Sequence, residues 1–128
     1  MPARLYPTLA EALEIHRQLV HEFGGSGGLR DPGRLEAALF RPQIGYYAGL
    51  VEEAAALLES LVNNHPFVDG NKRLGFAVTD TFLRLNGHCL DVEPGAAHRF
   101  MTDRIAKGKF RFPLVRDWIR THLRRLAG

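Results

Sequence analysis

The sequence predicts an all-α protein: a single compact domain over residues 1–128, built as a bundle of about six helices. Apolar residues recur at the i, i+3, i+4, i+7 spacing that gives a helix one buried face, and they do so in successive segments. No segment alternates apolar and polar residues long enough to indicate a regular β-sheet. With 128 residues, 45% of them hydrophobic, the chain can bury one core and is short for two domains.

The first two helices are separated by glycines. A helix is expected over residues 8–23, and the glycine-rich run Gly24–Gly28 must end it. The second helix begins after Asp31, a natural N-cap, with Pro32 at its first position. It stops before Pro42, so it should be short.

The third and fourth helices follow an irregular loop expected over residues 43–50. The third carries one apolar stripe, on which His65 is the last position. The fourth begins near Asn71 and ends at Asn86-Gly87, a common helix stop. Its apolar stripe consists of Leu74, Ala77, Val78, Thr81, Phe82 and Leu85.

The last part of the chain is expected to add two more helices. A short extended piece is predicted over residues 88–93, followed by helices over 94–107 and 113–126 that the region around Gly108 separates. The buried face of the final helix should consist of Val115, Trp118, Ile119, Leu123 and Leu126.

The composition excludes several classes of protein. The chain has one cysteine, Cys89, which excludes an internal disulfide framework and a cysteine-based zinc cluster. No apolar run approaches the roughly 20 residues that a membrane span needs. The residues after Met1 also lack the apolar stretch of a signal peptide. We therefore expect a cytoplasmic protein without a membrane partner.

Charge is distributed unevenly along the chain. Residues 1–98 carry 8 Lys and Arg against 12 Asp and Glu, whereas residues 99–128 carry 9 against 2. A basic surface of this kind can attract an acidic partner, although a terminal basic helix is more often simply a solvated face. The basic residues are not interleaved with aromatics, and no helix-turn-helix pattern is present, which argues against direct nucleic-acid binding.

Reactive side chains concentrate in the run His65–Arg73, between the third and fourth helices. Because His65 is on the inward stripe at a helix end, its ring is expected at the mouth of the core. Pro66 disfavours continuation of that helix, and Asp69-Gly70 allows a sharp turn into the helix that begins near Asn71.

The residue types in this run suit phosphate chemistry. A helix N-terminus offers unpaired N–H groups and a partial positive charge, and Asn71, Lys72 and Arg73 add side-chain donors. Asp69 would repel phosphate unless Mg²⁺ lay between them, and Mg²⁺ commonly binds one or two carboxylates. His65 could then take a proton from an attacking hydroxyl, because imidazole exchanges protons near neutral pH. The run thus predicts phosphoryl or nucleotidyl transfer; the structural alternative is a capped helix–helix turn.

The run His65–Arg73 resembles the signature of the Fic/Doc family, in which a histidine, a phenylalanine, an acidic residue and Gly-Asn-x-Arg follow at this spacing. The resemblance covers nearly the whole chain. It includes Asp31–Arg34 before a short helix, the Ala- and Leu-rich helix that leads into the motif, and Thr81–Gly87. These segments and the chain length look like the small Doc (death-on-curing) toxins of type II toxin–antitoxin systems.

The resemblance implies roles for the site residues. His65 would be the general base, Asp69 the Mg²⁺-binding residue, and Phe67 an anchor that fills the core. The phosphates of ATP would be bound by Gly70, Asn71, Lys72 and Arg73.

Lys72 bears on the reaction that the resemblance implies. Most adenylylating Fic proteins have glycine there, and a side chain would crowd the site for the α- and β-phosphates. The implied reaction is therefore transfer of the γ-phosphate of ATP, with a threonine of elongation factor Tu as the target and arrest of translation as the result. Some Doc proteins have an aliphatic residue at the position of Pro66, and in this respect the chain is more similar to the wider Fic family. Adenylylation is therefore the alternative reaction. A non-catalytic binding module that uses the C-terminal arginines is the second alternative.

The resemblance also implies a partner. Many Fic proteins restrain themselves with a helix bearing Ser/Thr-x-x-x-Glu-Gly/Asn, and no Ser or Thr here begins that pattern. A separate Phd-like antitoxin is then expected, whose C-terminal segment folds onto the toxin. A disordered acidic segment would be attracted by the basic residues 99–128.

Other residues are expected to be structural. His16 falls on an apolar stripe and should be a core residue, and Gly24–Gly28 should act as a hinge that shapes a flap near the target site rather than as a phosphate loop. Arg34 and Arg84 should be exposed helix charges, although Arg84 could approach the nucleotide.

Overall fold

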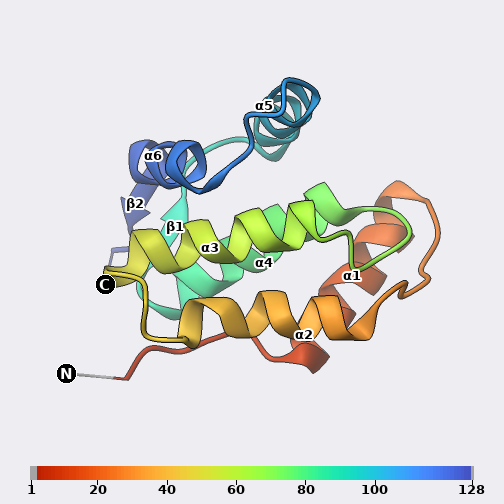
Figure 1. Cartoon of the computed structure of the whole chain (residues 1–128), viewed down its shortest axis with the longest axis horizontal. Helices are drawn as coiled ribbons and strands as arrows, with labels where there is room; N and C mark the ends of the chain where they lie inside the picture. Colours follow the sequence, from red (N-terminus) through yellow and green to blue (C-terminus); the bar gives the residue numbers. More distant parts are fainter. Residues whose placement is uncertain (1–2, 128) are drawn as a thin grey trace.

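In the computed structural model, which describes residues 3–127, helices follow one another with short irregular segments between them (Figure 1). The helices and strands of these residues are α1 (Leu9–Phe23), α2 (Pro32–Phe40), the 3-10 helix η1 (Arg41–Gln43), α3 (Gly49–Asn63), α4 (Asn71–Leu85), β1 (His88–Leu90), α5 (Pro94–Ala106), α6 (Phe112–His122) and β2 (Leu123–Arg125). The predicted all-α class with six helices is confirmed.

Helices α3 and α4 form the centre of the molecule. They run side by side through the middle of Figure 1, with α2 along α3 and with α6 and the two strands toward one end. Helix α1 and the glycine-rich segment that follows it lie at the other end, where α3 turns into α4 (Figure 1). The turn that carries the motif is therefore placed between the two central helices, as predicted.

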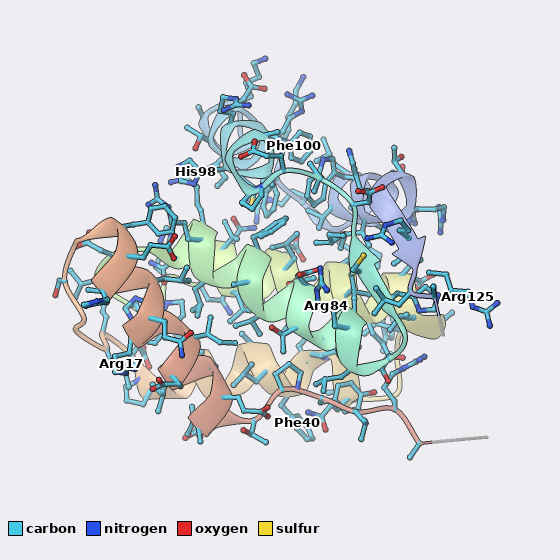
Figure 2. The ribbon with its side chains drawn as sticks, turned by 180° about the vertical axis from the view of Figure 1, so that it is seen from behind. Arg17, Phe40, Arg84, His98, Phe100 and Arg125 are labelled. Carbon is cyan, nitrogen blue, oxygen red and sulfur yellow. The ribbon has the colours of Figure 1, made fainter. Side chains whose placement is uncertain are left out.

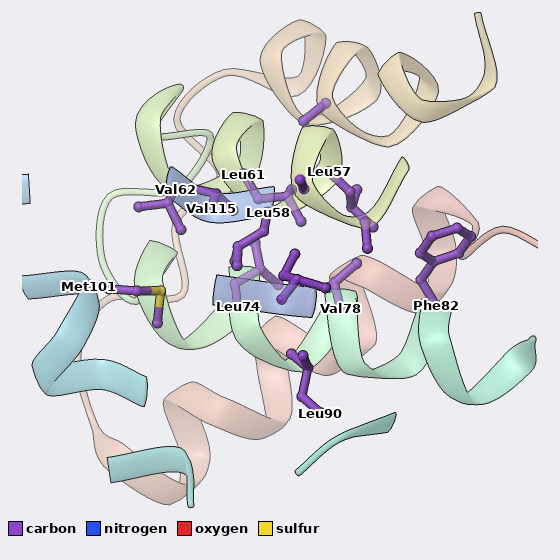
Figure 3. Close-up of a cluster of buried hydrophobic side chains, with 14 of the residues drawn as sticks. Leu57, Leu58, Leu61, Val62, Leu74, Val78, Phe82, Leu90, Met101 and Val115 are labelled. Atoms are coloured by element: carbon purple, nitrogen blue, oxygen red, sulfur yellow. The ribbon is translucent and has the colours of Figure 1, made fainter. Parts of the chain in front are cut away.

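The hydrophobic core is built around α3. Every residue from Ala54 to Leu58 is fully buried, so this helix is covered on almost all sides. Figure 3 shows Leu58 and Leu61 of α3 meeting Leu74 and Val78 of α4. Because burial of apolar surface is the main favourable contribution to folding, this contact holds both ends of the motif turn in place.

Gly75 allows α3 and α4 to approach closely. A Cβ atom at this position would lie 2.7 Å from Cγ2 of Val62 and 3.2 Å from Cδ1 of Leu58. Both distances are shorter than ordinary van der Waals contact, so a side chain here would force the two helices to shift.

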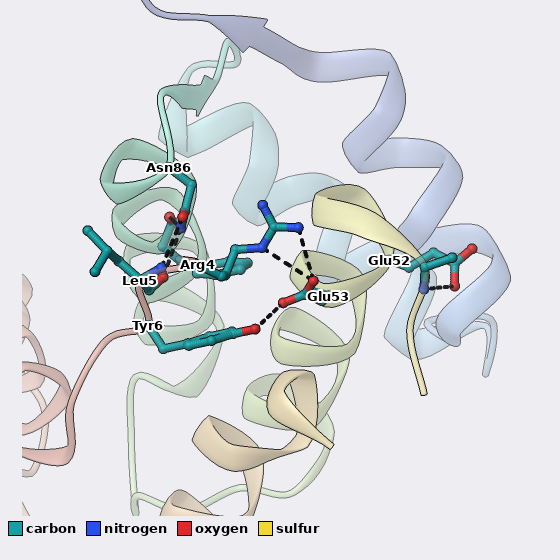
Figure 4. Close-up of polar contacts among 8 residues, drawn as sticks. Arg4, Leu5, Tyr6, Glu52, Glu53 and Asn86 are labelled. Atoms are coloured by element: carbon teal, nitrogen blue, oxygen red, sulfur yellow. Dashed lines mark hydrogen bonds and ion pairs between the residues drawn. The ribbon is translucent and has the colours of Figure 1, made fainter. Parts of the chain in front are cut away.

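The N-terminal segment ties the two central helices together (Figure 4). The Nη2 atom of Arg4 lies 3.1 Å from Oε2 of Glu53 in α3, and the Tyr6 hydroxyl donates to the same carboxylate. The backbone of Leu5 exchanges two hydrogen bonds with the side chain of Asn86, at the end of α4. Glu53 is buried, and these partners compensate for the loss of water around its charge.

Side-chain caps start several helices. Thr8 and Glu11 form a reciprocal capping box at the start of α1, and the Asp31 carboxylate accepts from the backbone N–H of Arg34 at the start of α2. The Asp31 cap and Pro32 at the first helical position are as predicted.

The C-terminal helix is shorter than predicted. It ends at His122 rather than near residue 126, and Leu123–Arg125 form β2, which pairs antiparallel with β1. Leu123 and Leu126 are half-buried rather than core residues. A strand of three residues is too short to show an alternating pattern, and the spacing of Leu123 fitted a helix equally well. The extended piece predicted over residues 88–93 is confirmed in part, since β1 covers His88–Leu90.

Two further details differ from the predictions. In α4 the buried face includes Leu83, while Leu85 is exposed, so the apolar stripe is rotated relative to the predicted one. The loop expected over residues 43–50 is partly ordered, since η1 includes Gln43 and α3 already begins at Gly49. Within residues 3–127, no helix has the length and apolar character needed to cross a membrane.

Candidate active site

His65 stands near the start of the turn between α3 and α4, and its side chain is exposed. Helix α3 ends at Asn63, and His65 adopts a φ of 49°, the one positive φ of a non-glycine residue in the described part of the chain. The prediction that His65 lies on the inward stripe of the helix is therefore wrong. Pro66 disfavours a helical backbone for the residue before it, so the helix stops early and the imidazole lies at the surface.

Phe67 anchors the turn in the core, as predicted. Its side chain is 2% exposed, and its ring stacks on the buried imidazole of His16. The side chain of Asn71 closes the turn: its Oδ1 accepts from Phe67 N–H at 3.0 Å, and its Nδ2 donates to Phe67 O at 2.9 Å. Both ends of this amide are thus engaged within the turn.

The motif turn ends at the N-terminus of α4. Gly70 is the N-cap, with φ 80° and ψ 18°, a left-handed conformation that glycine adopts without steric cost. It provides no side-chain cap. Among the described residues, the backbone N–H groups of Asn71, Lys72 and Arg73 have no hydrogen-bond acceptor. Three unpaired donors and the positive end of the helix dipole can bind an anion such as phosphate.

Two cations follow in the first turn of α4. Lys72 and Arg73 are both half-buried, and the Arg73 guanidinium lies 4.4 Å from the centroid of the Phe23 ring. Burial lowers the pKa of His98 in α5, and the positive charges of Arg73 and Lys72 lower it further. This end of α4 is therefore electropositive.

A cavity of about 430 Å³ adjoins Arg73. It lies between the end of α1, the start of α4 and the start of α5. Its lining is mainly apolar, and it consists of Leu19, Glu22, Phe23, Arg73, Phe76, Ala77, Pro94, Gly95, His98, Arg99 and Met101. His98 projects from α5, well separated from Arg84 (Figure 2). The Nδ1 atom of His98 is buried and has no hydrogen-bond partner within residues 3–127.

The glycine-rich segment pairs with the motif turn. The Ser26 N–H donates to Oδ2 of Asp69 at 2.9 Å, and Val68 N–H donates to Gly28 O at 3.1 Å. Leu29 and Phe67 form an isolated antiparallel bridge. The glycine-rich segment thus lies beside the motif turn, and its role as a hinge that shapes a flap stays a prediction.

The start of α2 also contacts the turn. Backbone N–H groups of Arg30 and Asp31 donate to Pro66 O at 2.8 and 3.0 Å, and Arg34 Nη1 donates to Asn64 O at 3.0 Å. The carbonyls of the residues on either side of His65 are thus both held by residues 30–34, at and just before the start of α2.

The donor set at Asp69 fits a magnesium ion that is shared with a phosphate. No group of three or more His, Cys, Asp or Glu within residues 3–127 could hold a metal alone. Asp69 is exposed, and its Oδ2 has the Ser26 amide as partner. One carboxylate beside a helix end that can bind phosphate would be sufficient, because Mg²⁺ completes its shell with water and phosphate oxygens.

Comparison with known proteins identifies the family. The model of the Fic/DOC family matches residues 6–83, which include α1 to α3, the motif turn and most of α4. The chain belongs to the Fic/DOC family. Helices α5 and α6 lie outside the matched residues, so one wall of the cavity beside Arg73 does too.

Two relatives of this Fic/DOC chain are informative. It is similar to "Toxin Doc" of Mycolicibacterium smegmatis, with 50% identity over 70 residues, 51% of this chain and 54% of that protein. It is also similar to "Protein kinase doc" of Escherichia phage P1, with 32% identity over 114 residues, 86% of this chain and 89% of that protein. The match therefore spans about half the length of the first relative and most of the second.

The structure of this Fic/DOC chain brings the predicted site residues together on one turn and helix start, running from His65 through Asp69 and Gly70 to Arg73. Arg84 is not among them. It lies in the last turn of α4, at the end away from Gly70, where it pairs with Asp80.

Sequence reasoning missed the part that two other residues play in the site. His16 is a buried residue, as expected, but its Nε2 lies 2.8 Å from Asp69 O. Arg34 is exposed, as expected, but it binds the backbone beside His65. The Asp31–Arg34 motif was a sequence signal for the contact of Arg34 with the backbone beside His65. No sequence signal indicated the contact of His16 with Asp69.

Proposed function

We propose that this Fic/DOC chain is the toxin of a type II toxin–antitoxin system and acts as a protein kinase. It would transfer the γ-phosphate of ATP to a hydroxyl group of a translation factor in the cytoplasm, with a threonine of elongation factor Tu as the expected target. The observation that carries the proposal is the start of α4, where three unpaired N–H groups and two cations adjoin a turn bearing an exposed histidine and an exposed aspartate.

Each group has a part in this reaction. The backbone N–H groups of Asn71, Lys72 and Arg73 would bind phosphate oxygens, and the Arg73 guanidinium would bind two at once. Asp69 would hold Mg²⁺, which neutralises phosphate charge when bound. The exposed imidazole of His65 would accept the proton of the substrate hydroxyl. Phosphoryl transfer depends mainly on such positioning and charge neutralisation.

The roles proposed for Asn71 and Gly70 are those of the backbone. Both ends of the Asn71 amide are bonded to Phe67, so this side chain would hold the turn while its N–H binds phosphate. Gly70 would allow close approach, because its left-handed backbone turns the chain into α4 without a side chain. A role of the Asn71 side chain in phosphate binding stays a prediction.

Two observations favour transfer of phosphate over transfer of AMP. Lys72 lies in the first turn of α4, at the position where most adenylylating Fic proteins have glycine, and a side chain there would crowd the site for an α-phosphate. The relative that aligns over 86% of this chain is named a protein kinase. The cavity beside Arg73 offers room for the nucleoside once the γ-phosphate lies at α4, which favours a nucleotide over free phosphate as the ligand.

The proposed toxin needs a restraining partner. A Phd-like antitoxin, whose C-terminal segment folds onto the toxin, would serve this role, and one relative is named a toxin. Within residues 99–127, many arginines of α5, α6 and β2 are exposed and would attract an acidic segment.

The test is transfer of radiolabel. Purified protein is incubated with Mg²⁺, elongation factor Tu or bacterial lysate, and ATP labelled in either the γ or the α position. The variants are His65→Ala and, as a matched control, His21→Ala, which removes another exposed histidine. We expect label from the γ position only, lost in His65→Ala and kept in His21→Ala.

Label from the α position would establish adenylylation instead, and absence of His65-dependent label would exclude both reactions. Harmless expression of active protein without an antitoxin would contradict the toxin role.

A further inference from the structure

The backbone on both sides of His65 is held by one short segment at the start of α2. Asn64 O accepts from Arg34 Nη1 at 3.0 Å, and Pro66 O accepts from the N–H groups of Arg30 and Asp31 at 2.8 and 3.0 Å. Residues 30–34 therefore hold the carbonyl groups of the two residues that neighbour the histidine.

His65 requires such support. Its φ of 49° is uncommon for a residue with a side chain, although histidine tolerates it better than most residues. The following Pro66 further limits the conformations open to it. A backbone of this kind persists only where its surroundings determine it, and such conformations are found most often at functional sites.

Arg34 is itself held in position by Asp31. The Arg34 Nε atom lies 3.2 Å from Oδ2 of Asp31, while Oδ1 of the same carboxylate accepts from the Arg34 backbone N–H at 3.1 Å. The carboxylate therefore caps α2 and orients the guanidinium at the same time. A planar guanidinium can serve Asp31 through one nitrogen and Asn64 through another, which a lysine ammonium does less well.

We propose that Arg34 is a positioning residue for His65, and that Asp31 is the residue that keeps Arg34 in place. Arg34 acts through the backbone at Asn64 and does not touch the nucleotide. This inference rests on the proposed function of His65 as the general base. The role of the Asp31–Arg34 motif at the start of α2 would then be to position His65.

The expected effect is on turnover rather than on ATP binding. A shift of about 1 Å in a reacting group can slow a reaction by about 100-fold, so we expect Arg34→Met to lower kcat by about 10- to 100-fold. The KM for ATP should change less than about twofold, because the phosphate-binding groups of α4 are untouched. A fall in ATP affinity with unchanged kcat would overturn the inference and make Arg34 a binding residue.

Three variants make the test specific. Arg34→Lys should restore part of the lost kcat. Asp31→Asn retains an N-cap acceptor but removes the charge that orients Arg34, so it should lower kcat less than Arg34→Met. Arg84→Met is the matched control: both arginines pair with a neighbouring aspartate on a helix, and their side chains are 52% and 54% exposed. Equal kcat in Arg34→Met and Arg84→Met would overturn the inference.

Hydrogen exchange separates this inference from the proposed function. The amides of Arg30, Asp31 and Val68 have backbone acceptors in this region, and they should exchange faster in Arg34→Met at an unchanged urea midpoint of unfolding. If wild-type protein transfers no label, the proposed function fails. The exchange result still tests whether Arg34 holds the backbone beside His65. Unchanged exchange together with unchanged kcat would overturn the positioning role.

Discussion

The imidazole of His16 lies flat against the ring of Phe67, with ring centroids 3.5 Å apart and planes inclined by 13°. His16 is 2% exposed, and its Nε2 lies 2.8 Å from the carbonyl oxygen of Asp69. Since a carbonyl oxygen can only accept, Nε2 must carry the proton. A single buried side chain of α1 thus supports both the apolar anchor and the acidic residue of the motif turn.

Replacement of His16 should therefore loosen the turn. His16→Leu keeps an apolar side chain but removes the donor to Asp69 O, and we expect a loss of about 1–3 kcal/mol in the free energy of unfolding. The proposed kinase activity should fall further than this loss of stability explains, because Asp69 would be displaced. His16→Gln retains an amide donor, and its stability and activity should lie between those of the wild type and of His16→Leu. Urea unfolding and kcat measure the effects; an active and fully stable His16→Leu would refute the role of His16.

Asp69→Asn should alter the magnesium dependence of the reaction. An asparagine oxygen can still accept from the Ser26 N–H, so the turn should keep its contact with the glycine-rich segment. The charge that is proposed to attract Mg²⁺ is lost, and we expect the Mg²⁺ concentration for half-maximal rate to rise by about tenfold or more. Initial rates over a magnesium series measure this. Asp91→Asn, which removes an exposed carboxylate elsewhere, should leave the series unchanged.

The pKa of His98 should report the positive charge at α4. Burial lowers this pKa, and Arg73 and Lys72 lower it further, while Glu22 and Arg99 line the same cavity. Lys72→Met removes one cation and should raise the pKa of His98 toward the ordinary value of about 6.5. Proton NMR of the imidazole against pH measures it, and an unchanged pKa would mean that Lys72 points away from the cavity.

The same shift predicts how stability depends on pH. The unfolded chain binds a proton at His98 near pH 6.5, whereas the folded chain binds it only at lower pH. The free energy of unfolding should therefore fall as the pH drops from about 6.5 to the pKa of the folded state. His98→Gln should reduce this dependence, as unfolding midpoints at several pH values would reveal.

The sequence allowed the motif turn to be predicted, but not the position of His65. Local signals marked the turn: Pro66 ends one helix, and Asp69-Gly70 allows the next to begin at Asn71, as the structure has it. Pro66 indicated that the helix would end near His65, but the left-handed backbone of His65 could not be predicted, because it is also held by contacts with residues 30–34, far away in the sequence. The contact of His16 with Asp69 likewise depends on how α1 packs against α4 and the turn before it.

Ala77→Leu tests whether the cavity beside Arg73 receives the nucleoside. Leucine is a good helix former, so the substitution should leave α4 intact while filling part of the space. We expect the KM for ATP to rise on the order of tenfold, equivalent to about 1.4 kcal/mol of binding free energy. Ala37→Leu, at an exposed position of α2, is the control. An unchanged KM would place the nucleoside elsewhere.

Gly75→Ala should destabilise the protein although alanine favours helices. The substitution gains about 1 kcal/mol of helix propensity. However, the added Cβ would lie 2.7 Å from Cγ2 of Val62, a buried and stiff side chain, and overpacking of this kind typically costs about 1–3 kcal/mol. We expect the steric cost to exceed the gain, so that urea unfolding shows a net loss.

Gly33→Ala is the matched control for this prediction, because its Cβ would meet only the Asp31 carboxylate, at an ordinary contact distance of 3.4 Å. It should be neutral or slightly stabilising. Since the motif turn joins α3 directly to α4, separation of these helices in Gly75→Ala should also lower kcat, without any change in a residue of the turn. Wild-type stability and activity in Gly75→Ala would mean that Val62 can move aside and that the close helix contact does not position the site.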